Sequence, residues 1–406
     1  MENSYKLAEP DYVLFVLASI LVIVGVIFSY SLSVYTVLLF DYNDFHFFIR
    51  QFIYALLGIG IMYLFLNADP YRFVQKVGKW FFLIFFVLIV LMPFMPDFLV
   101  TESGGAKRWI KFPGISISPV EFFKIGFIYF LASSFNRNII GKSTATKLVE
   151  EYILFFPYFF VFLIVLVFVA YFQKDLGQSM LMAMILITFI IFANRSKKLI
   201  MSLFLAGVVG FVALIAVAGH RIKRIAEWWA MHQDSVLGLF PDSVKKQLTV
   251  VGYEEPYQVG HSLNAIANGG ITGEGLGNGF LKMGFLSEVH TDFVLAGIAE
   301  EIGWFGIVMV LCLVLAISWR IFRISNRVQE NVFHFFTLGI AVMIIGAFFI
   351  NSFGISGVIP IKGIAVPFLS YGGSSIIASC VGIGLVLSIS RVTNIKIDAE
   401  KKIENI

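Results

Sequence analysis

The sequence predicts an all-α polytopic membrane protein with about ten transmembrane helices, and three observations support this fold class. Hydrophobic residues make up 59% of the 406 positions and charged residues only 14%, whereas soluble domains are about one-quarter charged. The apolar residues gather into runs long enough to cross about 30 Å of hydrocarbon. Basic residues concentrate in alternate connections between these runs. Residues 1–406 are therefore predicted to form one integral-membrane domain.

Ten apolar runs are the predicted spans. They lie near residues 12–40, 47–67, 80–96, 118–135, 153–172, 178–193, 199–219, 291–318, 333–353 and 374–392. The first run is too long for the core of a signal peptide and has no small-residue cleavage site, so we expect it to be retained. A large loop, residues 220–290, separates the seventh and eighth spans, and an amphipathic helix is expected in its residues 221–231.

The placement of basic residues predicts the orientation. The two ends and the second, fourth, sixth and eighth loops hold more than half of the 30 lysines and arginines. The positive-inside rule then places both termini in the cytoplasm. Four segments with polar content are expected to face outward, namely 101–118, 173–178, 220–290 and 354–371.

Residues 360–375 combine one lysine, two prolines, three glycines and four hydroxyl side chains between two apolar runs. Such backbone is tolerated near membrane depth only where it is buried in protein or lines a watery cavity, because each unpaired amide costs several kcal/mol in hydrocarbon. This segment, which contains Lys362 and Ser370, is therefore predicted to line a site.

Ionisable residues near the ends of spans are a second indication of a site. Each costs at least about 2.5–3.5 kcal/mol at membrane depth, so each is a functional hypothesis. Ser118 and Pro119 predict a helix start, which places Glu121 and Lys124 on one face of that helix. The two charges either neutralise each other in helix packing or line an outward-facing cavity.

Two loops add further candidates. Arg108 and Trp109 offer a cation and an aromatic plane, which suit a phosphate and a sugar ring but are also typical of an interfacial anchor. Asp175 lies in a turn too short to be a free loop. It either caps the next helix or lines the same cavity.

Asp292 is the strongest single carboxylate, because it stands where an outward loop becomes the eighth span. With Glu288 and His290 beside it, it is placed to accept a proton. Glu300 and Glu301 lie further along this span. They are either functional charges at membrane depth or, equally, partners of groups on neighbouring helices.

The remaining motifs exclude several classes of function. The glycine-rich run 269–279 does not fit a dinucleotide-binding fingerprint, and the sequence has no Walker loop or HExxH motif. It also lacks the cysteine and histidine spacing of a metal site. We therefore expect no nucleic-acid partner and no metal held by the protein alone.

Lys362-Gly363 followed by residues 367–375 resembles the signature of the SEDS family, the FtsW, RodA and SpoVE proteins of bacterial wall synthesis. Further blocks agree in order and spacing, namely 105–110 with 118–124, 174–177, and 288–293 with Glu300 and Glu301. The resemblance covers essentially the whole chain. Lys174 and Ser287 depart from prolines that are usual in the family, so the local turns are expected to differ there.

The resemblance implies a peptidoglycan glycosyltransferase that polymerises lipid II at the outer face of the bacterial cytoplasmic (inner) membrane. Asp292 would take the family's essential aspartate. The implied substrate-binding residues are Arg108, Trp109, Glu121, Lys124, Asp175, Glu288, His290, Lys362 and Ser370. Lys362 and the segment 255–262 favour the FtsW type, which acts in division, over the RodA type, which acts in elongation.

The resemblance also implies partners and a mechanism. The partners are a class B penicillin-binding protein transpeptidase and other divisome proteins. Asp292 would deprotonate the acceptor sugar, while Arg108, Lys124 and Lys362 hold the diphosphate leaving group. No cofactor is firmly expected, and a divalent cation (Mg²⁺ or Mn²⁺) at the diphosphate stays open.

Two other classes of function are weighed against this one. Intramembrane charges and broken helices also mark transporters, so a lipid II flippase is the main alternative. A scaffold for division proteins is another, although it would not need these charges. The charges gather at the outer ends of the spans rather than at the midplane, which favours chemistry at the outer surface.

Overall fold

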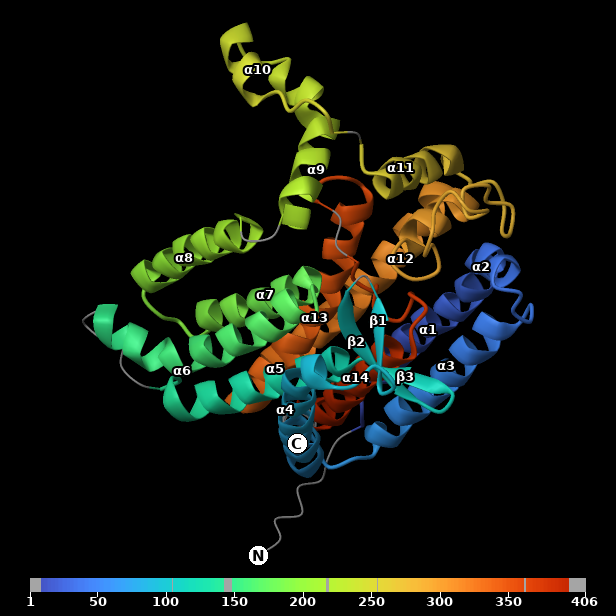
Figure 1. The fold of residues 1–406 in the computed structure, drawn as a ribbon. Helices are drawn as coiled ribbons and strands as arrows, with labels where there is room; N and C mark the ends of the chain where they lie inside the picture. Colours follow the sequence, from blue (N-terminus) through green and yellow to red (C-terminus); the bar gives the residue numbers. More distant parts are fainter. Residues whose placement is uncertain are drawn as a thin grey trace, which may run out of the picture.

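Helices dominate the structure (Figure 1). The computed structural model describes residues 9–103, 105–141, 148–216, 219–253, 255–360 and 363–393. Its helices are α1 (Tyr12–Leu32), α2 (Val34–Leu39), α3 (His46–Leu66), α4 (Pro70–Leu91), α5 (Pro119–Asn138), α6 (Leu148–Leu166), α7 (Leu176–Phe192), α8 (Lys197–Ala216), α9 (Gly219–Leu237), α10 (Asp242–Leu248), α11 (Tyr257–Gly269), α12 (Val294–Arg327), α13 (Asn331–Ile355) and α14 (Gly373–Thr393). Short turns extend two of them, η1 (Met92–Phe94) after α4 and the π-helical η2 (Val167–Phe172) after α6.

Seven helical segments in the described ranges are long and apolar enough to cross a membrane. They are Tyr12–Leu32, His46–Leu66, Pro70–Phe94, Leu148–Phe172, Val294–Arg327, Asn331–Ile355 and Gly373–Val392. The prediction of a helical, multi-pass membrane protein is confirmed at this level. The other three predicted spans correspond to α5, α7 and α8, of which α7 is apolar but only 17 residues long.

Two predicted boundaries are wrong for local reasons. The third predicted span begins at Pro70 rather than near residue 80, because Asp69 caps the helix by accepting a hydrogen bond from the Tyr71 amide at 2.9 Å. Proline also suits the first helical position. The first predicted span is two helices, since the chain breaks at Ser33 between α1 and α2.

The all-α prediction is wrong for the connection between α4 and α5. It forms a three-stranded antiparallel sheet in the order β1 (Val100–Ser103), β2 (Ala106–Phe112) and β3 (Ile115–Ile117). Val100 and Ile110 pack with Met92 in a small core beneath this sheet. The sequence did not predict these strands, because they are short. A register shift between Thr101 and Glu102 also interrupts the alternation of apolar and polar residues that identifies a strand.

The predicted loop 220–290 is largely helical, since it contains most of α9 together with α10 and α11. The predicted amphipathic helix at 221–231 lies within α9, so that prediction is confirmed. In Figure 1, α9 and α10 project from the other helices at the top of the view.

The two helices at the centre of the fold are α13 and α14. In each of their apolar segments 83% of the residues are buried, compared with 17–44% in the other five segments. α14 packs against α3, α5 and α4, and α13 packs against α12, α5 and α7. In the connection between α13 and α14, residues 366–370 are buried in protein, whereas Gly363 and Ala365 line a cavity, and both environments tolerate polar, broken backbone.

α12 is kinked at Gly303, where φ is 68° and ψ is −161°. The kink frees backbone groups, and the glycine-rich segment satisfies them: the Trp304 amide donates to the Gly270 carbonyl at 2.9 Å. A Cβ at Gly273 would lie 2.2 Å from the Glu301 carbonyl oxygen, so a side chain would not fit there. The glycine-rich run is a tightly turned layer on α12.

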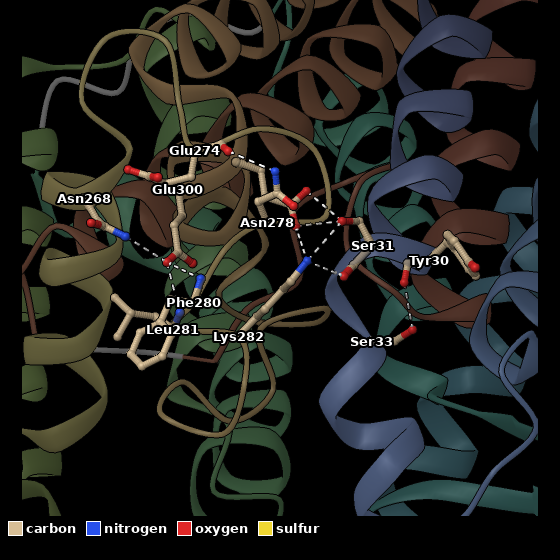
Figure 2. A network of polar contacts seen from close by, with 11 residues as sticks. Tyr30, Ser31, Ser33, Asn268, Glu274, Asn278, Phe280, Leu281, Lys282 and Glu300 are labelled. Atoms are coloured by element: carbon tan, nitrogen blue, oxygen red, sulfur yellow. Dashed lines mark hydrogen bonds and ion pairs between the residues drawn. The ribbon is translucent and has the colours of Figure 1, made fainter.

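A buried polar network fixes this layer to α1 and α12 (Figure 2). The Lys282 ammonium lies 2.6 Å from a Glu301 carboxylate oxygen and 3.0 Å from the Ser31 carbonyl, and the side chains of Lys282 and Glu301 are 2% and 0% exposed. Glu300 accepts a hydrogen bond from the Leu281 amide at 2.9 Å. Of the two alternatives left open for Glu300 and Glu301, these contacts favour a role in packing.

Lys282→Met is expected to lower the free energy of unfolding by about 3–5 kcal/mol, because it leaves the buried Glu301 charge without its cation. Lys245→Met, which removes an exposed ion pair with Asp242 at 3.4 Å, is the control and should cost less than about 1 kcal/mol. Equal thermal unfolding midpoints for the two variants would contradict this account of the network.

Candidate active site

A cavity of about 770 Å³ lies where β2, the 173–175 turn, the segment before α12 and the segment before α14 meet. We call it the central cavity. Six of the predicted site residues line it: Arg108, Trp109, Glu121, Asp175, Glu288 and Asp292. The fold thus brings together side chains from four connections and helix starts that are far apart in the sequence.

A smaller compartment of about 160 Å³, called the side compartment, adjoins the central cavity. The two share Arg108, Asp175, Asp292 and Gly363 in their walls. Among the described residues that line it, the side compartment carries an excess of cations. Four basic residues, Arg108, Lys174, Arg221 and Arg224, outnumber two carboxylates, Asp175 and Asp292. Asp292 therefore stands at the junction of both spaces.

Local backbone contacts hold Asp292 in position just before α12. Its amide donates to the Glu288 carbonyl at 3.2 Å. The Asn351 side-chain amide donates to the carbonyls of Asp292 and Ile364, at 2.7 and 2.8 Å. A Cβ at Gly363 would lie 2.4 Å from Oδ2 of Asp292, so the backbone at Gly363 closely approaches the carboxylate.

The segment before α14 is fastened to the segment before α12 by two further contacts. The Ser370 hydroxyl donates to the Thr291 carbonyl at 2.7 Å and accepts from the Val366 amide at 2.8 Å. The Tyr371 amide donates to the His290 carbonyl at 2.8 Å. We call these bonds, together with those of Asn351, the backbone clamp.

Burial raises the pKa of the Asp292 carboxyl to about 6, and the negative charges of Asp175 and Glu288 act in the same direction. The positive charge of Arg108 opposes this rise. A carboxylate with a pKa near 6 is a stronger base than an ordinary aspartate and is still mostly ionised at neutral pH. The site therefore favours proton acceptance by Asp292.

Asp175 both caps α7 and lines the cavity, so the two alternatives for it hold together. Its carboxylate accepts a hydrogen bond from the Gln178 amide at 3.0 Å. Burial raises its pKa, and the Arg108 charge lowers it. Arg108 is itself held on this turn, because it donates to the carbonyls of Gln173 and Lys174 at 2.8 and 3.1 Å.

Glu121 lines the central cavity, whereas Lys124 lies behind it. The Lys124 ammonium is 2.8 Å from Oε2 of Glu121, and the Gln178 side-chain amide donates to Oε1 at 2.6 Å. Both predicted interpretations of this pair therefore apply: the charges neutralise each other, and the carboxylate faces the cavity.

Three predicted substrate-binding residues lie outside the walls of both compartments. Lys124, His290 and Ser370 are 5%, 4% and 1% exposed. The His290 ring packs against Phe47 and Tyr371, and burial lowers its pKa. These three side chains support the cavity from behind. Lys362 lies outside the described residues.

Several cavity residues were missed by the sequence analysis. Arg50 lies in α3, within the second predicted span, where the rule that charges at membrane depth are functional hypotheses would have identified it. Lys111, Gln178 and Arg224 carry no comparable signal, because only the sheet and the position of α9 bring them to the two compartments.

Within the described part of the chain, no group of three or more histidine, cysteine, aspartate or glutamate side chains could hold a metal ion. A cation bound mainly by substrate phosphates and water needs only one or two carboxylates. The cavity carboxylates fit that mode of binding but not a cage made by the protein alone.

Fold and site together define a multi-pass membrane protein with carboxylates in the walls of a charged cavity. The family model for FtsW, RodA and SpoVE, described as a cell cycle protein, matches residues 11–395. The chain belongs to this family.

Curated relatives and solved structures agree with this assignment. The chain is 46% identical over 387 residues to a probable peptidoglycan glycosyltransferase FtsW of Helicobacter pylori (strain J99), covering 94% of this chain and 99% of that protein. It is 31% identical over 382 residues to the protein of the same name from Geobacter sp. (strain M18), covering 94% and 96%.

Two solved structures share the fold. A chain from a peptidoglycan synthase complex that coordinates polymerization and crosslinking gives a TM-score of 0.68 at 21% identity, with 95% and 98% of the two chains covered. The rod shape determining protein RodA of Thermus thermophilus gives 0.61 at 20% identity, with 95% and 97% covered.

At pH values above 6, Asp292→Asn is expected to unfold at a higher midpoint temperature than wild type. The folded-state pKa of about 6 lies above the ordinary aspartate value, so the ionised carboxylate destabilises the fold as pH rises from about 4 to 6 and remains destabilising above it. Near pH 4 wild type and variant should have the same midpoint.

Asp97→Asn is the matched control, because the Lys107 ammonium 2.9 Å away lowers the pKa of that exposed carboxyl. This variant should gain no stability at any pH. A lower midpoint for Asp292→Asn than for wild type at pH 7 would show that ionised Asp292 stabilises the fold, contrary to this account.

Proposed function

We propose that the protein is a peptidoglycan glycosyltransferase that polymerises lipid II at the outer face of the cytoplasmic membrane, in septal wall synthesis. Its family membership and its identity of 46% to a relative named for this activity support the reaction class. The observation that carries the chemistry is the position of Asp292, a carboxylate with a raised pKa at the junction of the central cavity and the side compartment.

The proposed reaction is a single inverting displacement. Asp292 accepts the proton of the acceptor sugar 4-hydroxyl, and the oxygen attacks the anomeric carbon of the donor. The bond from that carbon to the diphosphate oxygen breaks, and lipid diphosphate leaves as an anion. Because the leaving group is a stabilised anion, one base is enough, whereas hydrolysis of an ordinary glycoside also needs an acid.

The cations of the side compartment support the proposal that the leaving diphosphate lies in this compartment. Arg108 lies in the walls of both compartments, and the exposed Arg224 side chain adds charge beside it. Fixed cations near the departing oxygen stabilise the charge that develops there. In this proposal Lys124 does not contact the diphosphate. It is paired with Glu121, and of the two only Glu121 lines the central cavity.

The finer topology belongs to the same proposal. Ten spans, made by α1, α3 to α8 and α12 to α14, place every connection that lines the two compartments at one end of the helices. That end faces outward when both termini are cytoplasmic, as the basic residues predict. We further propose a class B penicillin-binding protein and other divisome proteins as partners.

A divalent cation, Mg²⁺ or Mn²⁺, is proposed as a companion of the diphosphate rather than a resident of the protein. Asp175 or Asp292 could each contribute one carboxylate oxygen to such an ion. The ion would supply positive charge at the diphosphate. The base and the arginines carry their roles without it.

The test is glycan-chain formation from purified lipid II by the protein with its cognate transpeptidase, under penicillin to prevent crosslinking. Asp292→Asn keeps the shape of the side chain and removes the base, so the rate is expected to fall by about 10²–10⁴-fold. Polymer formation at the wild-type rate by Asp292→Asn would refute the base. Movement of lipid II across vesicles without any polymer would favour a transporter.

The pH dependence of polymerisation provides a separate prediction. The wild-type rate should rise with an apparent pKa near 6, as Asp292 ionises. Asp175→Asn retains a good helix cap but removes a charge that raises the Asp292 pKa, so the rise should move to lower pH. Arg108→Gln removes a charge that lowers this pKa, so the rise should move to higher pH.

General damage to the site would lower the rate at every pH. A shift in the pH at which the rate rises instead reports a change in the pKa of Asp292. Asp97→Asn should leave it unchanged. Shifts of Asp175→Asn and Arg108→Gln in the same direction would contradict the assignment of the titration to Asp292.

A further inference from the structure

A third pocket of about 550 Å³ lies beyond the side compartment, between α9 and the residues before and at the start of α11. We call it the aromatic pocket. It shares Arg224 and Gln258 with the side compartment, which in turn shares Asp292 with the central cavity. The aromatic pocket therefore adjoins the side compartment, and Asp292 is not among the residues that line it.

Three aromatic rings line the aromatic pocket: Trp228, Tyr253 and Tyr257. The Trp228 ring is fixed, because its indole N–H donates to the Gly357 carbonyl at 2.7 Å. The Tyr257 ring packs edge-on against His261, with centroids 4.3 Å apart, yet the residue remains 63% exposed. Rigid aromatic faces that stay accessible offer contact area at a low cost in conformational entropy.

Among the described residues that line the aromatic pocket, basic and acidic side chains are equal in number, unlike those of the side compartment. Lys223 and Arg224 stand against Glu227 and Glu255, and Gln258 adds an amide. Lys223 is also 3.7 Å from Glu227. These four charged side chains give the described lining no surplus of cations for a diphosphate. Aromatic faces combined with a few carboxylate and amide groups match a sugar ring, whose C–H face is apolar and whose rim carries hydroxyl and amide groups.

We propose that the aromatic pocket is a glycan subsite, which holds a sugar of the growing strand while the reacting sugars lie at Asp292. The proposal rests on the proposed polymerase function and adds a second saccharide-binding site to it. A strand held in this pocket stays at a high effective concentration near the base between additions, so the pocket favours long chains.

Binding of a soluble tetrasaccharide of alternating N-acetylglucosamine and N-acetylmuramic acid tests this proposal without relying on catalysis. The full chain carrying Asp292→Asn is used, so that nothing turns over, and binding is followed by saturation-transfer NMR. Tyr257→Ala or Tyr253→Ala added to it should weaken binding about tenfold, and Tyr257→Phe should preserve it.

Phe240→Ala is the matched control, because Phe240 is an aromatic residue 47% exposed after α9 that does not line the aromatic pocket. Unchanged affinity in both tyrosine-to-alanine variants, or no binding of the tetrasaccharide at all, would overturn the glycan subsite. Tyrosine-dependent binding supports it.

The mean length of the glycan product tests the glycan subsite separately from the polymerase activity. With Asp292 restored, Tyr257→Ala should give a shorter mean glycan length than Phe240→Ala in the lipid II assay. Polymer of normal length from Tyr257→Ala would refute the glycan subsite and leave the polymerase in place. Tyrosine-dependent tetrasaccharide binding by a protein that makes no polymer would refute the polymerase and leave a glycan-binding site.

Discussion

The structure depends on satisfying the backbone of one broken segment in the middle of the helices. The segment before α14 cannot form a helix through its prolines and glycines, and α13 and α14 are the most buried of the apolar helices. Its polar groups must therefore find partners within the protein. The backbone clamp provides them, through Asn351, Ser370 and Tyr371. The same bonds also hold the residues around Asp292. The backbone clamp therefore both satisfies the broken segment and fixes the position of the proposed base.

Stability and function oppose each other at this position. The negative charges of Asp175 and Glu288 act on Asp292 across the cavity, and burial adds to the cost of ionising Asp292. Arg108 offsets part of that cost while it is held on the turn before α7. The balance raises the pKa of Asp292 to about 6, which is useful for a base. Elsewhere, the Lys282–Glu301 pair uses buried charge purely for packing, so burial alone does not mark a catalytic residue.

The sequence predicts the parts of the fold and site that follow from local composition. Glu121, Asp175 and Asp292 were identified because each is an acid at the edge of an apolar run, and all three line the central cavity. The β-sheet and the helices of 220–290 were harder, since short polar elements lack a clear periodicity. The role of Ser370 could not be predicted at all: whether its hydroxyl meets a substrate or the Thr291 carbonyl is decided by a contact 79 positions away. Arg224 reaches the site only because α9 lies over it.

The central claim is that the clamp holds Asp292 in position as a base with a pKa of about 6. Its most direct test is an infrared difference titration of the carboxyl group, with wild-type spectra subtracted from those of Asp292→Asn across the pH range. The account predicts a protonated carboxyl signal that disappears with a pKa near 6, in step with the rise in polymerisation rate. A signal that titrates near the ordinary aspartate value, or a rate that does not follow it, would contradict the account.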